Sequence, residues 1–529
     1  MIFGRVKPLD AILATAEKKS LHRSLGAFQL TMLGIGAVIG TGIFVLTSEA
    51  AQKAGPGMLF SFIVAGFVCG VAALCYSELA SMVPVAGSAY TYTYAVVGEL
   101  LAWMVGWALI LEYAVGASAV AVGWSNHAVG LLAASGIHFP AILSNADALM
   151  AHVQLAFGAT ASPDLLTAAQ TGGWINIPAV VISIAVMLLL VLGTTESAFV
   201  NALLVCIKIA ALSLFVFLTL PGMHTANFQP FLPTGSFGVF GAAASIFFAY
   251  VGFDAVSTAA EETKNPQRNV PIGLIGSLLI CTLFYLLVAS GAIGAIGAQP
   301  VTGADGAVLA PGTAEIAGRC AAITASGAIE PLVCSKEALV HVLQVIGHPI
   351  FGWMVGLAAV LALPSVVLMM MYGQTRIFFT MARDGLLPAK LASVHPKFRT
   401  PHIVTFVTGI AAAIAAAFLP VGKLADYSNS GTLFAFLMVA VSVMVLRKTD
   451  PSRKRPFRTP IVWIVAPLAI IGCLALYASL PLTAILVLPV WGVVGLVVYF
   501  LYSRSRSYVG RGIIEVTTLD DTDMTAVRP

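Results

Sequence analysis

Gly34-Ile-Gly-Ala-Val-Ile-Gly-Thr-Gly-Ile-Phe44 lies within the first long apolar segment of the chain, roughly residues 26–50, and it decides the fold. Its four glycines, Gly34, Gly36, Gly40 and Gly42, stand where an unbroken helix would carry leucine or alanine, and glycine weakens a helix. The segment therefore predicts a helix that breaks, or one that a second backbone approaches very closely. A break exposes N–H groups that attract an anion and carbonyl groups that attract a cation. A zwitterion carries both charges.

The same stretch has two other interpretations. Gly36 and Gly40 also form a small-residue face on which a second helix could pack, and the glycine spacing alone fits this equally well. The spacing also loosely resembles a dinucleotide-binding loop, but no strand precedes it and its flanks are apolar, which excludes that interpretation.

The composition indicates a polytopic α-helical membrane protein. Of the 529 residues, 59% are hydrophobic and only 9% are charged, whereas soluble proteins carry about 25% charged residues. Apolar runs of the ~20 residues needed to cross a bilayer recur along the chain. Residues 1–24 lack the apolar core and cleavage site of a signal peptide, so we expect a retained tail. The sequence contains no metal-ligand cluster, and we expect neither a cofactor nor a nucleic-acid partner.

Twelve membrane-spanning helices are predicted, with Pro56, Pro178, Pro271, Pro401 and Pro460 at helix starts, where a missing N–H does least harm. The spans are roughly 26–50, 57–83, 100–129, 175–193, 197–220, 238–262, 271–297, 348–380, 402–420, 424–446, 461–479 and 482–503.

The lysines and arginines predict the orientation. Of 27, 22 lie on one side of the membrane if the N-terminus is inside, four lie on the other side, and Lys208 lies within a span. Because positive charge collects on the cytoplasmic side, both termini are predicted to be cytoplasmic, in a bacterial inner or plasma membrane.

The predicted outer loops are long. The loop 298–347 holds Cys320 and Cys334, for which a disulfide and two free thiols are both compatible with the sequence. The loop 130–174 has no Lys or Arg, and we expect a partly ordered cap. The other five cysteines lie in apolar spans and are predicted to be small packing residues; they are Cys69, Cys75, Cys206, Cys281 and Cys473.

A second interrupted segment follows at Ser245-Ile-Phe-Phe-Ala-Tyr-Val-Gly-Phe-Asp-Ala-Val256, where Gly252 and Asp254 suit no lipid-facing helix. It belongs to span six, five spans after the first break. Two broken helices in corresponding positions of two halves indicate an inverted-repeat transporter with its site at the bilayer midplane.

At these residues the chain resembles the amino acid/polyamine/organocation superfamily of secondary transporters, and within it a bacterial member of the cationic amino acid transporter family. The matching stretches run from residue 25 to about 500; they are Gly36 to Phe44, Tyr76 to Ala80, Pro84 to Tyr90, Phe248 to Ala255, Glu261 to Pro271, Arg383 to Pro388 and Arg453 to Pro460.

The resemblance implies the leucine-transporter-type fold, in which two repeats of five helices have opposite orientation and two further helices are peripheral. The expected divisions are a tail 1–24, repeats 25–220 and 238–446, a basic cytoplasmic loop 447–460, two helices in 461–503 and a tail 504–529.

The resemblance also implies the substrate site. The substrate carboxylate would meet the N–H groups of Thr41 and Gly42. The substrate amine would meet carbonyls near Val38 and Ile39 in the first span and near Phe248, Ala249 and Val251 in the sixth. Tyr250 and Phe253 could be gate or pocket aromatics, although ordinary helix packing explains them as well.

Three deep charges are candidates for function, because a charge at mid-bilayer costs at least ~2.5 kcal/mol. Lys208 could carry a coupling proton beside the first break, as in proton-coupled relatives, or be a permanently paired cation. Glu112 could relay protons, balance Lys208 or meet a cationic substrate, or be a protonated, hydrogen-bonded group. Asp254 matches an acidic position of a proton-sensitive exchanger, and either gating or an inner hydrogen bond would explain it.

Other polar residues are assigned structural roles. Glu78 is predicted to anchor the loop that follows span two. Glu261, Glu262, Lys264 and Arg268 are predicted to form a cytoplasmic charge network. Met369 to Met371 are predicted to fill the core.

These observations predict a proton-coupled importer of cationic or small neutral amino acids that works by alternating access. An exchanger without net proton movement is the nearest alternative, and an amino acid sensor is a further one. A membrane enzyme is disfavoured because no nucleophile–base pair stands out. The expected partners are the substrate, the bilayer and, undetermined by the sequence, a small membrane subunit.

Overall fold

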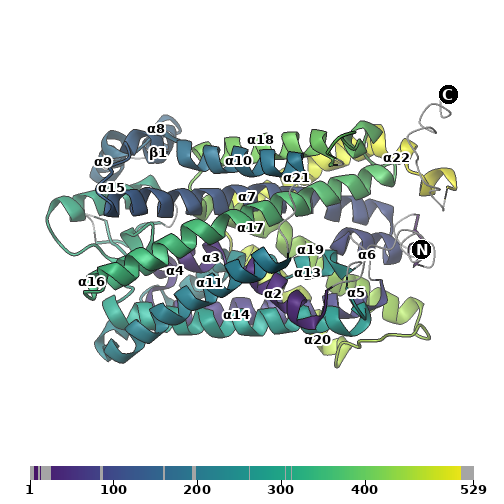
Figure 1. Ribbon diagram of the computed structural model, residues 1–529, viewed down its shortest axis with the longest axis horizontal. Coiled ribbons are helices and arrows are strands. Elements are labelled where there is room, and N and C mark those ends of the chain that lie inside the picture. The colour runs from purple at the N-terminus through teal and green to yellow at the C-terminus, as the bar shows by residue number, and fades with distance from the viewer. Residues whose placement is uncertain are drawn as a thin grey trace.

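The computed structural model describes residues 5–9, 12, 25–83, 87–158, 161–193, 198–260, 263–303, 306–310, 313–398 and 400–513. Long helices run side by side along the long axis of the molecule (Figure 1). Helices α6 (Ser88–Val96) and α22 (Arg504–Arg506) lie at one end, which we call the terminal end. Helices α8 (Asp147–Ala156), α9 (Pro163–Thr171) and α15 (Ala314–Ala325) lie at the opposite end and form the cap.

Seven helical segments within the described ranges are long and apolar enough to cross a membrane. The helices in them are α5 (Met58–Met82), α7 (Glu99–Ala134), α11 (Ala198–Thr219), α14 (Pro266–Ile296), α17 (Pro349–Arg383), α19 (Val421–Thr449) and α21 (Leu482–Val498). The shorter apolar helices are α2 (Ala27–Val38), α10 (Ile177–Leu192), α12 (Gly235–Ile246), α18 (His402–Phe418) and α20 (Val462–Ala478). Each lies within a predicted span or overlaps one closely.

Both predicted interruptions are present. The first apolar segment divides into α2, α3 (Thr41–Phe44) and α4 (Leu46–Ala54), and Ile39 and Gly40 separate the first two. The sixth divides into α12, the 3-10 turn η5 (Phe247–Tyr250) and α13 (Ala255–Thr258). Gly252 lies in the second gap with a φ of +111°, a conformation that favours glycine.

Local sequence signals explain several helix ends. The Asn176 side chain accepts a hydrogen bond from Ala179 N at the start of α10, with Pro178 in the first turn. Gly193 ends α10 in the left-handed conformation. Ser162 caps α9 through Leu165 N.

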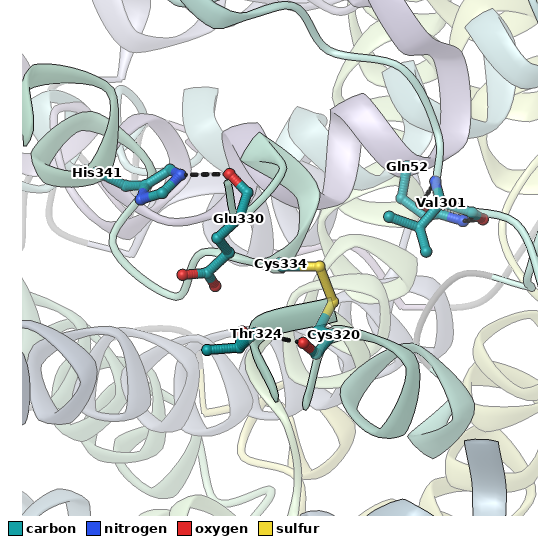
Figure 2. The surroundings of a disulfide bond; sticks show 7 residues. All are labelled: Gln52, Val301, Cys320, Thr324, Glu330, Cys334 and His341. Atoms are coloured by element: carbon teal, nitrogen blue, oxygen red, sulfur yellow. Dashed lines mark hydrogen bonds between the residues drawn. A yellow bond between two sulfur atoms is a disulfide. The ribbon is translucent and has the colours of Figure 1, made fainter. Parts of the chain in front are cut away.

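The cap has its own small core of Ala151, Leu165, Ala168 and Ala314. A two-residue strand β1 (Ser144–Asn145) pairs antiparallel with β2 (Ile175–Asn176), a small departure from the all-α prediction. A disulfide joins Cys320 of α15 to Cys334 of the 3-10 turn η7 (Leu332–Cys334), and α16 (Ala338–Val345) follows (Figure 2).

The remaining elements are single turns. They are η1 (Gly55–Gly57), η2 (Ala141–Leu143), η3 (Leu220–Gly222), η4 (Thr225–Phe228), η8 (Ala389–Ala392), η10 (Val509–Arg511) and the π-helical turn η9 (Tyr499–Ser503).

Two predictions were wrong in detail. Pro271 lies inside α14, because Pro266 takes the first position of that helix. Cys206 is exposed, since its part of α11 faces outward rather than into the core. Glu78 has partners that the prediction did not include: it accepts two hydrogen bonds of 2.7 and 2.8 Å from Arg447 at the end of α19, and its Oε2 accepts from Thr459 N at 2.8 Å, while residues 84–86 of the loop after α5 lie outside the described residues.

Candidate functional site

The two helix breaks touch each other in the middle of the bundle. A Cβ built on Gly42 would lie 2.2 Å from Ala249 Cα, and one built on Gly252 would lie 3.0 Å from the carbonyl oxygen of Ala37. The backbones of the two broken segments are therefore in direct contact at two points, and at Gly42 only glycine allows this.

Side chains of neighbouring helices bind the carbonyls at both breaks. The Lys208 amine of α11 donates to Gly36 O at 2.7 Å. The Tyr285 hydroxyl of α14 lies 2.9 Å from Val38 O and 2.7 Å from Ala249 O, one carbonyl from each break. The Asn429 amide of α19 donates to Ala244 O and Ser245 O at 2.8 and 3.0 Å, at the end of α12. Side chains of α11, α14 and α19 thus donate hydrogen bonds to backbone carbonyls near the two breaks, where helical hydrogen bonding is interrupted.

Lys208 is 1% exposed, so its amine lies in the interior of the bundle. Gly36 allows the approach of α11, because a Cβ there would lie 2.8 Å from Val205 Cγ2. The amine sits at the C-terminal end of α2, where the helix dipole favours a positive charge. Gly34 likewise admits Ser277 of α14.

The residues predicted to bind the substrate amine are buried. Val38, Ile39, Phe248, Ala249 and Val251 are all at most 4% exposed. Thr41 and Gly42 begin α3, and with α4 they supply the N–H end of the first break. The side chain of Thr41 lies outside the described part of the structure.

Glu112 of α7 is fully buried close to the second break. Neither of its carboxylate oxygens has a hydrogen-bond partner among the described residues. One turn along α7, a Cβ on Gly116 would meet Ser428, Met370 and Phe248 at 3.3 to 3.6 Å. Side chains of α17, α19 and η5 therefore pack closely around Gly116 of α7, and the Glu112 carboxyl group lies one turn away on α7.

Asp254 follows the second break and accepts a hydrogen bond of 2.9 Å from the Tyr113 hydroxyl of α7. The two predicted gate aromatics, Tyr250 and Phe253, are both buried beside the second break. Tyr250 donates to Phe62 O at 2.9 Å, and Phe253 packs edge-on against Tyr76.

A polar cluster closes the site toward the cap. Lys53 of α4 pairs with Asp426 of α19 at 3.3 Å, and both contact the Ser245 hydroxyl of α12. Because α4 and α12 are halves of the two broken helices, this cluster, the cap-side latch, ties both to α19. Figure 2 shows a further tie of α4, in which Gln52 exchanges hydrogen bonds with the backbone of Val301.

A second cluster closes the terminal end. The Lys7 amine pairs with Asp384 Oδ1 at 2.7 Å, and the Tyr90 hydroxyl donates to Asp384 Oδ2 at 2.8 Å. We call these three residues the terminal-side latch. It connects the chain before α2 to α6 and to the turn after α17.

A cavity of about 310 Å³ opens beside the cap, between α7, α16 and the start of α17. Glu330, Glu337 and His341 line it, and the His341 ring contacts Glu330 O at 2.7 Å (Figure 2). Burial, together with repulsion from Glu330, raises the pKa of Glu337 to about 8. This cavity is separate from the helix breaks.

Sequence reasoning located the breaks and Lys208 but missed Tyr285, Asn429, Asp426 and the two latches. The polar run around Asp426 and Asn429 within an apolar span was the signal that could have found two of them. Glu261 and Glu262 lie outside the described residues. No group of three His, Cys, Asp or Glu in the described ranges lies close enough to bind a metal ion.

Comparison with known proteins shows which family and which transporters this chain is similar to. The profile of the family described as "Amino acid permease" matches residues 25–502. A branched-chain amino acid permease of Bacillus subtilis is 43% identical over 96% of this chain and 98% of its own. A methylthioribose transporter of the same organism is 40% identical over 96% of this chain and 99% of its own. The vacuolar cationic amino acid transporter 2 of Arabidopsis thaliana is 34% identical over 85% of this chain and 64% of its own.

Proposed function

The chain belongs to the amino acid permease family of the amino acid/polyamine/organocation superfamily, and from this premise we propose that it imports amino acids by proton symport with alternating access. It is an integral membrane transporter and not an enzyme. The observation that carries the proposal is the contact between two broken helices whose peptide groups lie side by side, with the Lys208 amine on one of them.

The peptide groups at the breaks suit a zwitterion. The N–H end at Thr41 and Gly42 favours the substrate carboxylate, and the carbonyls of Val38, Ile39, Phe248, Ala249 and Val251 favour the substrate amine. The site then lies between two repeats of five helices, 25–220 and 238–446, with two peripheral helices, twelve spans in all.

Lys208 is the proposed proton carrier. An amine in the interior of the bundle that donates to the first break links its charge to the geometry of that break. One proton crossing ~100 mV supplies about 2.3 kcal/mol, enough for roughly fifty-fold accumulation of a neutral substrate. Asp254 and Glu112 are the two further buried groups that we propose could exchange a proton during transport.

The two latches are the proposed gates. The cap-side latch joins half-helices of both breaks to α19, and the terminal-side latch joins the chain before α2 to α17. Breaking one latch at a time would open the site to one side at a time, as alternating access requires. With both termini cytoplasmic, as the positive charges favour, the cap would face outward from an inner or plasma membrane.

The side chains packed around Gly116 support a proposal for the substrate class. Phe248 and Met370 suit an apolar side chain, and the 43% identical relative is named as a branched-chain amino acid permease. Glu112 one turn away would suit a cationic side chain, as the names of the plant relatives would. We place neutral apolar amino acids first and cationic ones second.

The test is uptake of the twenty common amino acids into proteoliposomes, with and without an imposed pH gradient, in vesicles either empty or preloaded with the same amino acid. We expect gradient-driven accumulation in empty vesicles. Uptake that occurs only into preloaded vesicles would refute symport and establish the exchanger. Uptake of none of the amino acids in any vesicle would refute the substrate class.

A further inference from the structure

Tyr285 connects the two helix breaks directly. Its hydroxyl lies 2.9 Å from Val38 O, at the end of α2, and 2.7 Å from Ala249 O, in η5. The side chain is fully buried, and its ring packs against the rings of Tyr250 and Phe62, with centroids 5.3 and 5.8 Å away. Packing therefore fixes the ring, and the ring aims the hydroxyl at both carbonyls.

The Tyr285 hydroxyl has fewer hydrogens to donate than it has acceptors. A phenol has a single hydrogen to donate, and here two carbonyl oxygens share it. Without that hydrogen, both buried carbonyls would lose this donor, which is costly in a protein interior. An ammonium group, with three N–H donors, could serve both carbonyls at once.

We propose that Tyr285 is a positioning residue that substitutes for the substrate amine, keeping the two breaks together when no amino acid is bound. This inference rests on the proposed function, because it takes Val38 O and Ala249 O as acceptors for the amine. A bound amino acid brings its own donors, so the loaded protein depends less on the hydroxyl than the protein without substrate does.

The consequence distinguishes net transport from exchange. Net uptake requires the carrier to return without substrate, and on that return only the Tyr285 hydroxyl bridges Val38 O and Ala249 O. Exchange returns with substrate, whose amine can take over the hydroxyl's role. Loss of the hydroxyl should therefore impair net uptake more than exchange.

The first test measures thermal unfolding of the purified full-length protein with and without amino acid. The variant is Tyr285→Phe, which keeps the ring. The control is Tyr477→Phe, which removes a hydroxyl that donates to Ile485 O at 2.6 Å between the peripheral helices α20 and α21. The probe is whichever of the twenty common amino acids stabilises the wild type most.

We expect Tyr285→Phe to unfold at a lower temperature than wild type without amino acid, and saturating amino acid to remove at least half of that deficit. The deficit of Tyr477→Phe should be the same in both conditions. An equal deficit of Tyr285→Phe with and without amino acid would overturn the inference and leave the proposed function intact. If no amino acid stabilises the wild type, the proposed function and this inference both fail.

The second test compares net uptake with exchange in proteoliposomes. For Tyr285→Phe, we expect the ratio of net uptake to exchange to fall at least about fivefold, the effect expected when a buried hydrogen-bonding group loses its partner. This ratio does not depend on how much of the variant folds. An unchanged ratio would overturn the inference. If the wild type shows exchange alone, symport fails as a function and the unfolding measurement decides the role of Tyr285.

Discussion

Replacing Gly42 with alanine adds one methyl group at the point where the two broken helices meet. The added Cβ would lie 2.2 Å from Ala249 Cα and 2.3 Å from Ala249 Cβ. Carbon atoms pack at about 3.5–4.0 Å, so the two segments must separate there by about 1.3–1.8 Å. The obstacle is backbone, which no side-chain rotation can move aside.

The separation would also disturb the Tyr285 contact. A shift of that size takes one of its two hydrogen bonds, now 2.7 and 2.9 Å, beyond the limit of about 3.2 Å. Overpacking costs about 1–3 kcal/mol, and a buried carbonyl without a donor costs a similar amount. We expect Gly42→Ala to lower the free energy of unfolding by several kcal/mol and to weaken amino acid binding at least tenfold.

The matched control lies two residues away in the same break. A Cβ on Gly40 would lie 3.4 Å from Val366 Cγ1, the end of a side chain, which is near-ordinary contact. Neither glycine has a positive φ, so alanine is allowed at both. Thermal unfolding and equilibrium binding of Gly42→Ala, Gly40→Ala and wild type decide the question. If Gly42→Ala binds and unfolds as Gly40→Ala does, the direct contact between the breaks has no role in binding.

Three further predictions follow from the buried charges. Lys208→Met should abolish accumulation driven by a pH gradient while the protein still folds, and undiminished dependence of uptake on the gradient would contradict the proposed coupling. Asp426→Asn leaves the buried Lys53 amine without its ion-pair partner, which is costly; we expect a Vmax for uptake at least tenfold lower, and an unchanged Vmax would exclude the cap-side latch as a gate. Because the pKa of Glu337 is raised from 4.5 to about 8, the folded protein keeps a proton that the unfolded chain releases, so this group makes stability fall as the pH rises from 4.5 to about 8. Glu337→Gln should remove that fall and unfold at a higher temperature than wild type at pH 8, which melting curves across this range would verify.

The sequence predicted what depends on local chemistry. Gly252 marks the second gap because its positive φ favours glycine, and the glycine-rich first stretch contains the first gap at Ile39 and Gly40. The apolar runs located the long helices to within a few residues. The paired strands β1 and β2 were missed because two residues carry too little pattern to predict, and α6 was missed because its nine residues are too few to span a membrane.

The contacts that the sequence did not predict are those between helices that are distant in the chain. Tyr285 lies in an ordinary apolar span, and nothing near it in the sequence distinguishes it from a packing tyrosine until α14 is placed beside both breaks. Lys53 and Asp426 are 373 residues apart. The contact of Glu78 with Arg447 was missed for the same reason, because Arg447 ends α19, 369 residues further along the chain.

The position of Lys208 provides a physical link between its own protonation and the binding of substrate. Its amine and the Tyr285 hydroxyl bind carbonyls two residues apart at the end of the same half-helix, Gly36 O and Val38 O. A change in the charge of the amine therefore alters the segment whose last carbonyls are the proposed acceptors for substrate. If protonation of Lys208 changes substrate affinity by some factor, substrate must change the proton affinity of Lys208 by the same factor. Coupling of proton binding to substrate binding would thus require no direct contact between the two ligands, only that both act on this one end of α2.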